Sequence, residues 1–213
     1  MNQKIKQNQI VFACISPHPP IILPSVGSLS DRIRVKNTIR ALEKLSKEIK
    51  KKKFEKIIIS SPHPDWGIEV PLFFLAPEFN GEIKIYLTNL QEPSFYFQEG
   101  KLFYKKEIAP FSSPVLLIAS GDMSHCLKED GPYGFHPDGP QFDQSFIKAL
   151  KGKDIKSILK LEKLYPQASE CGLRSFCFLL GILEESGLNW QPKVLSYEGP
   201  FGVGYLVVNF KLK

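Results

Sequence analysis

The motif Ser-Pro-His-Pro occurs twice, at 16–19 and 61–64, and each copy directly follows an apolar run. The runs IVFACIS (10–16) and KIIIS (56–60) have the length and β-branched content of buried strands. A residue before proline is pushed out of helical geometry, and proline itself cannot donate to a sheet ladder. Each strand is therefore predicted to end with its histidine at the edge of the sheet.

The segment between the two strands, SLSDRIRVKNTIRALEKLSKEIKKK, has apolar residues at helical spacing, with Ser28 or Ser30 as the N-cap. Strand, helix and strand joined by short connections predict a right-handed crossover and parallel strands, which we expect to be neighbours. Neighbouring backbones lie about 4.8 Å apart, and two imidazoles can share one ion at about 2.1 Å from each nitrogen. The pattern thus predicts that His18 and His63 form a ligand pair.

The rest of the chain predicts a single α/β domain over 10–213, with a central mixed, mostly parallel sheet flanked by helices, after a polar tail at 1–9. PVLLIAS predicts a third buried strand, and a glycine-rich turn near the C-terminus predicts a closing hairpin. Further strands are expected at 68–77 and 81–90, an irregular segment at 91–113, and helices at 140–150, 153–162 and 168–186.

Composition excludes several classes of function. The net charge of +6 is modest, and its densest source, the lysines of 47–56, fits a solvated helix end better than a nucleic-acid site. No apolar run approaches the roughly 20 residues of a membrane helix, and the N-terminus lacks a signal peptide, so we expect a cytoplasmic protein without membrane or nucleic-acid partners. The four cysteines form no CxxC pair, which favours reduced thiols.

The remaining site candidates follow the third strand or lie near a helix start. GDMSH brings His125 and Asp122 to what we expect to be the same sheet edge, and His136 follows in GFHPDGP as a loop or supporting residue. Two histidines and one carboxylate leave open positions on iron(II), and the candidate carboxylates are Asp65, Asp122 and Glu170. Glu170 has an alternative interpretation as a first-turn acid that interacts with the helix dipole.

Four short runs occur in a characteristic order: ISPHPP, SPHPDWG, ASGDMSHCL and SECGLRSF. Together they resemble the class III extradiol ring-cleaving dioxygenase superfamily of the LigB type, including its Memo-like branch. The overall pattern is similar to small prokaryotic proteins described as AmmeMemoRadiSam system protein B-like. The resemblance spans about residues 10–185 and implies the α/β fold of that superfamily.

The resemblance implies a set of roles for the candidate residues. His18, His63 and Glu170 would hold a non-haem iron(II), and His125 would be the catalytic acid-base residue. The implied substrates are a small aromatic diol of the catechol type and O2, and the implied product is a ring opened next to the diol. A homo-oligomer is compatible with the sequence.

Two features of the chain depart from the dioxygenase pattern and keep other interpretations open. Memo-like members place the cysteine of a C-G motif near the metal, and here Cys171 follows Glu170 directly, while Asp122 matches the Memo-like aspartate. Residues adjacent on a helix point about 100° apart, so the two are not expected to coordinate equally. A non-catalytic Memo-like protein that binds metal or ligand in the same cleft is one alternative, and a zinc hydrolase is another.

Overall fold

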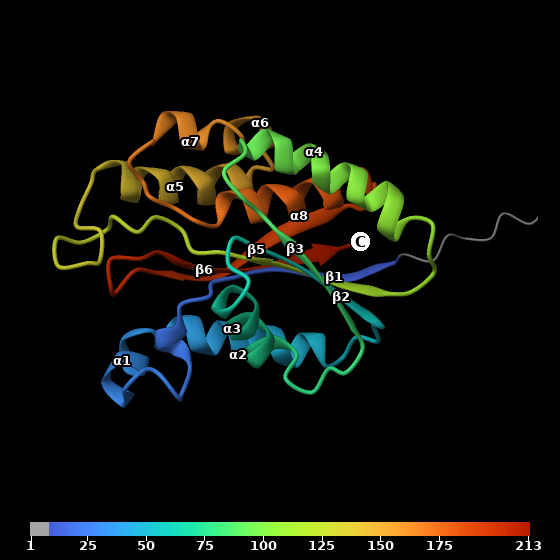
Figure 1. Cartoon of the computed structure of the whole chain (residues 1–213), viewed down its shortest axis with the longest axis horizontal. Coiled ribbons are helices and arrows are strands. Elements are labelled where there is room, and N and C mark those ends of the chain that lie inside the picture. Colours follow the sequence, from blue (N-terminus) through green and yellow to red (C-terminus); the bar gives the residue numbers. More distant parts are fainter. Residues whose placement is uncertain (1–8) are drawn as a thin grey trace, which may run out of the picture.

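The computed structural model describes residues 9–213, and the predicted polar tail lies almost entirely outside this part of the chain. Helices cover both faces of one six-stranded sheet (Figure 1), which confirms the predicted fold class. The strand order is β3-β2-β4-β1-β6-β5, with β3, β2, β4 and β1 parallel and with β6 antiparallel to both β1 and β5. The strands are β1 (Ile10–Ser16), β2 (Lys56–Ser61), β3 (Glu82–Leu87), β4 (Val115–Ser120), β5 (Trp190–Glu198) and β6 (Tyr205–Leu212).

The expectation that the first two strands are neighbours is wrong, because β4 lies between β1 and β2 and pairs with both. A β-α-β pattern determines direction and handedness but leaves room for an inserted strand. All six residues of β4 are buried, so its apolar sequence belongs at the centre of the sheet. The carboxyl ends of β1, β4 and β2 consequently lie side by side at one edge.

The helices form a layer on each face of the sheet. In Figure 1, α1, α2 and α3 lie below the sheet, and α4 to α8 lie above it. The α-helices are α1 (Leu29–Arg34), α2 (Lys36–Ile49), α3 (Trp66–Leu75), α4 (Pro93–Phe103), α5 (Asp138–Lys151), α6 (Ile155–Ile158), α7 (Leu161–Leu164) and α8 (Leu173–Glu185). A 3-10 turn, η1 (Pro20–Ile22), follows β1, and a π-helical turn, η2 (Tyr104–Ile108), extends α4.

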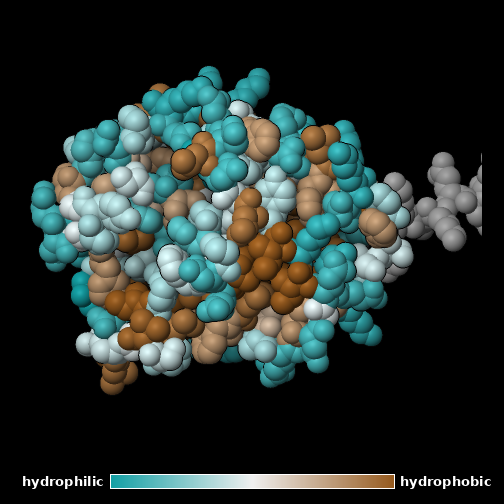
Figure 2. Space-filling view, in the orientation of Figure 1, coloured by the Kyte–Doolittle hydropathy of each residue, from teal (hydrophilic) through white to brown (hydrophobic). Residues whose placement is uncertain are grey.

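Two apolar cores result from the alternation of side chains along the strands. On β4, Leu117 and Ala119 pack toward α5 and α8, whereas Leu116 and Ile118 pack toward α2 and α3. The edge strand β3 is covered less well than the centre of the sheet, since its residues Ile83, Ile85 and Leu87 are exposed. Figure 2 shows an apolar patch on the surface over this strand.

Two segments differ from the expectations. Residues 66–75 form α3 rather than a strand, and 93–108 form α4 and η2 rather than an irregular segment. The run IEVPLFFL is short and apolar except for Glu69, so periodicity cannot distinguish a strand from a buried helix. The Ser28 N-cap is confirmed, because Ser28 and Asp31 form a reciprocal capping box. No helix of the described residues is long and apolar enough to cross a membrane.

Candidate metal centre

Three chain segments meet at the carboxyl edge of the sheet and bring metal-ligating side chains together. His18 follows β1, His63 follows β2, and Cys171 lies in the loop before α8. One ligand atom from each lies within 4.8 Å of the others, and the Cys171 sulfur is 3.4 Å from Nε2 of His18. A second group of Asp122, His125 and Cys171 satisfies the same limit. Cys171 therefore joins two adjoining clusters.

The orientation of the His18 ring follows from a proline in α3. Pro71 has no N–H, so the Gly67 carbonyl four residues earlier lacks its helical partner. The Ser120 hydroxyl donates to that carbonyl at 2.5 Å, and its oxygen lies 2.9 Å from Nδ1 of His18. Because Ser120 has only one hydroxyl proton, it must accept from Nδ1–H of His18. The free lone pair of His18 is thus on Nε2, which faces Cys171.

His63 is held more locally than His18. Its backbone N–H donates to the Ser61 hydroxyl at 3.1 Å, and that hydroxyl contacts the His63 carbonyl at 3.0 Å. The ring lies 5.2 Å from the His18 ring, edge-on, and 5.0 Å from the exposed Trp66 ring. Gly67 permits this packing, because a Cβ there would lie 2.2 Å from Ser61 Oγ. The second motif therefore places a half-buried imidazole beside the indole ring of Trp66.

Two glycines allow the Asp122 and Cys171 segments to approach each other. A Cβ on Gly121 would lie 2.2 Å from Cα of Gly172, so only glycine fits. The Gly172 N–H donates to the Asp122 carbonyl at 3.0 Å, and the Asp122 N–H donates to the Cys171 sulfur at 3.3 Å. A carboxylate oxygen of Asp122 also accepts the backbone N–H of His18 at 3.0 Å. Asp122 therefore ties the first strand end to the Cys171 loop.

His125 is fixed by its backbone and leaves one ring nitrogen available. Its N–H donates to the Ala168 carbonyl at 3.2 Å, and its ring lies 5.2 Å from the exposed Tyr133 ring. Its Nε2 is buried and has no hydrogen-bond partner in the described part of the chain. A buried polar atom without a partner is costly unless a ligand satisfies it.

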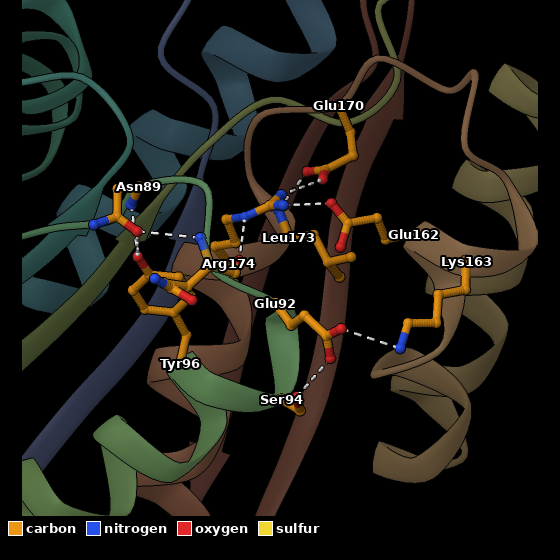
Figure 3. A network of polar contacts seen from close by, with 10 residues as sticks. Asn89, Glu92, Ser94, Tyr96, Glu162, Lys163, Glu170, Leu173 and Arg174 are labelled. Atoms are coloured by element: carbon orange, nitrogen blue, oxygen red, sulfur yellow. Dashed lines mark hydrogen bonds and ion pairs between the residues drawn. The ribbon is translucent and has the colours of Figure 1, made fainter.

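Glu170, predicted as the third ligand, lies outside both clusters, and Figure 3 shows its carboxylate beside the Arg174 side chain. Its carboxylate accepts the Leu173 N–H at 2.6 Å and lies 3.3 Å from the Arg174 guanidinium, which also pairs with Glu162. Glu170 therefore lies before α8 rather than in its first turn, but it accepts the first N–H of that helix, which is close to the alternative interpretation from the sequence. The geometry therefore favours Cys171 over Glu170, because the carboxylate is already engaged on the other side of the loop.

Two further candidates are not brought into the centre. Asp65 is exposed at the start of α3. His136 accepts the Asp138 N–H at its Nδ1 at 3.1 Å, and its side chain is 44% exposed. Neither residue belongs to the two clusters among the described residues. The sequence analysis missed Ser120, which contacts His18 directly. The one signal in the sequence is Pro71, which leaves the Gly67 carbonyl free to accept from Ser120.

Burial keeps the imidazoles of His18 and His125 neutral. Desolvation, with repulsion from His63 and His125, lowers the pKa of His18 to about 3, and desolvation and His63 lower the pKa of His125 to about 4. Desolvation raises the pKa of Asp122 to about 7, although the His18 N–H opposes it. Neutral imidazoles and a thiol that loses its proton on coordination are suitable donors for a divalent transition metal. The unpartnered Nε2 of His125 is a further nitrogen that a ligand at this centre could satisfy.

The fold and the cluster together define a class: an α/β protein with potential metal-ligating side chains gathered at the carboxyl edge of its parallel strands. Residues 63–208, more than half of the chain, match the family described as the catalytic LigB subunit of aromatic ring-opening dioxygenase. The chain belongs to this family, and the match begins at His63, after the first histidine motif.

Two further comparisons find a relative in sequence and a neighbour in fold. The protein CA_C1420 of Clostridium acetobutylicum is 27% identical over 266 aligned positions, which cover 92% of this chain and 56% of the relative. The chain thus spans only about half the length of that curated relative. The crystal structure of the uncharacterized protein JW3007 from Escherichia coli K12 superposes with a TM-score of 0.59 at 13% identity, over 93% of this chain and 98% of the other.

Proposed function

We propose that the chain binds one divalent metal ion through His18, His63 and Cys171 and acts as an extradiol-type dioxygenase on a small aromatic diol. The convergence of these three ligand atoms within 4.8 Å is the observation that supports the metal site. The family match supports ring-opening chemistry with O2. Iron(II) is the metal expected from that chemistry, and the thiol also makes zinc a compatible ion.

When bound, the metal would bring the diol and O2 together and supply electrons. The protein residues orient the diol and move its proton. His125 is the proposed acid-base residue, because its ring is neutral and Nε2 is buried without a partner. Asp122, within 4.8 Å in the second cluster, would stabilise the protonated imidazole. The exposed ring of Trp66 lies beside His63, and the exposed ring of Tyr133 lies beside His125. Both rings offer flat surfaces to an aromatic substrate.

Oxygen uptake tests this function directly. Protein loaded anaerobically with iron(II) should consume O2 when a catechol is added. His125→Ala should lower the rate by about 100-fold or more while metal stoichiometry stays at the wild-type value. His136→Gln, which changes a histidine outside the clusters, is the matched control and should keep the wild-type rate. Equal rates in wild type and His125→Ala would exclude the proposed role.

A second candidate is a non-catalytic Memo-like protein that uses the same cleft for metal or ligand binding. The observation in its favour is that Cys171, rather than the Glu170 carboxylate, faces the imidazoles. This candidate predicts metal binding that depends on Cys171 without O2 uptake across a panel of catechols. Steady O2 uptake that is lost in His125→Ala would exclude it.

A further inference from the structure

A pocket lies between α2 and the edge strand β5, on the side of the sheet away from β3. Its volume is about 430 Å³. From α2 it is lined by Asn37, Arg40 and Lys44, and from β5 by Leu195, Ser196 and Tyr197. None of these residues belongs to the metal clusters described above.

Two cationic side chains of α2 line this pocket. Arg40 and Lys44 are one helical turn apart on α2, and both side chains are exposed. Within the described residues, neither makes a salt bridge or a side-chain hydrogen bond. Of the nearby carboxylates, Glu198 accepts hydrogen bonds from Asn37 and Thr38, and Glu48 accepts from Asn209 and Lys211 and is also attracted by Lys44 at longer range. Two cations are therefore available to a ligand.

A bulge in β5 turns a hydroxyl toward this pocket. The register with β6 shifts between Val194 and Ser196, so Leu195 is the extra residue. Tyr197 donates to Asp143 of α5 at 2.5 Å, whereas Glu198 contacts α2, so alternation places Ser196 on the α2 side. The Ser196 Oγ is buried and has no hydrogen-bond partner in the described chain. Leu195 packs on the same side, in the core beneath α2.

We infer that this pocket binds a small phosphate monoester. An arginine guanidinium matches two phosphate oxygens, a lysine one turn away adds a point charge, and together they balance the two negative charges of the monoester. The Ser196 hydroxyl supplies a neutral donor, and Ala41 and Leu195 form an apolar wall for the organic part of the ligand. Inorganic phosphate carries the same charge but has no organic group to contact Ala41 and Leu195.

Calorimetric titration with phenyl phosphate and with inorganic phosphate tests this site. Phenyl phosphate should bind the wild type with 1:1 stoichiometry and more tightly than inorganic phosphate. The double variant Arg40→Gln/Lys44→Gln should weaken phenyl phosphate binding by about 100-fold, and Ser196→Ala by about threefold to tenfold. The control Lys36→Gln/Lys47→Gln removes the same charge from the same helix outside the pocket and should retain wild-type affinity.

Two outcomes would overturn the inference. Equal weakening in both double variants would mean general attraction to a basic surface. Binding that is lost in His63→Ala but kept in Arg40→Gln/Lys44→Gln would mean that phosphate binds at the metal centre instead. All exchanged charged residues are exposed, so unchanged thermal unfolding monitored by circular dichroism is expected for both double variants.

Discussion

His18 and His63 occupy the same position in two copies of Ser-Pro-His-Pro, yet their surroundings differ. His18 is 2% exposed, and its ring is oriented by Ser120, 102 residues away in the sequence. His63 is half-buried, and its backbone is braced by Ser61, two residues away. The local sequence ends each strand in the same manner, while tertiary contacts decide how rigidly each imidazole is held. The first motif therefore holds its histidine buried and fixed, whereas the second leaves its histidine partly accessible to solvent.

The largest expected difference between the motifs concerns folding stability. His18→Ala removes a buried ring and leaves the Ser120 hydroxyl without its donor, so the free energy of unfolding should fall by about 2–4 kcal/mol. His63→Ala should cost less than about 1 kcal/mol, because that ring is half-exposed. Urea denaturation in the presence of a chelator measures both. Equal losses would show that the two motifs are equivalent.

The pH dependence of metal-free stability should distinguish the motifs next. The pKa of His18 is lowered to about 3 in the folded state, so between about pH 3 and 6.5 the unfolded state binds the extra proton and stability falls as pH decreases. His18→Gln removes this contribution, and the wild type should lose roughly 1.5 kcal/mol more than the variant between pH 6.5 and pH 5. The matched variant His63→Gln should keep most of the wild-type loss, because burial, the largest cause of the lowered pKa of His18, is unchanged in it. Parallel curves for His18→Gln and wild type would contradict the burial of His18.

The serines of the two motif environments should differ in their effect on metal affinity. Ser120→Ala removes the acceptor for Nδ1–H of His18 and should weaken metal binding about tenfold. Ser61→Ala removes only contacts to the His63 backbone and should change affinity less than about threefold. Anaerobic calorimetry on both variants makes the comparison, and a larger loss in Ser61→Ala would reverse it.

The smallest effects are expected at the excluded candidates. Asp65→Asn and His136→Gln should leave metal affinity within about threefold of the wild type, since Asp65 is exposed and His136 contacts Asp138. The same titration measures them. A tenfold loss in either variant would extend the site beyond the two clusters.

Much of the fold was predictable because it depends on local pattern. The buried strands, the Ser28 cap and the closing hairpin follow from apolar runs, capping chemistry and turn residues. The insertion of β4 between β1 and β2 was not predictable, because pairing is a long-range choice among similar apolar strands. The helix α3 was missed because its ten residues are apolar with the single exception of Glu69, which leaves no informative periodicity.

The site was predictable only as far as strand ends define it. Proline-bounded histidines indicated the edge where His18 and His63 meet, and their roles as ligands stay predictions. The choice between Glu170 and Cys171 depends on how the chain turns before α8 and on the Arg174 guanidinium that pairs with Glu170. Neither contact can be derived from the spacing of residues in the sequence. The role of Ser120 depends on a carbonyl that Pro71 leaves free in another helix.

The most direct test of the metal centre is anaerobic iron(II) titration of the wild type, Cys171→Ser and Glu170→Gln by calorimetry. We expect one ion per wild-type chain, an affinity at least about 100-fold lower in Cys171→Ser, and an affinity within about threefold of wild type in Glu170→Gln. Loss of binding in Glu170→Gln with wild-type binding in Cys171→Ser would contradict the proposed ligand set.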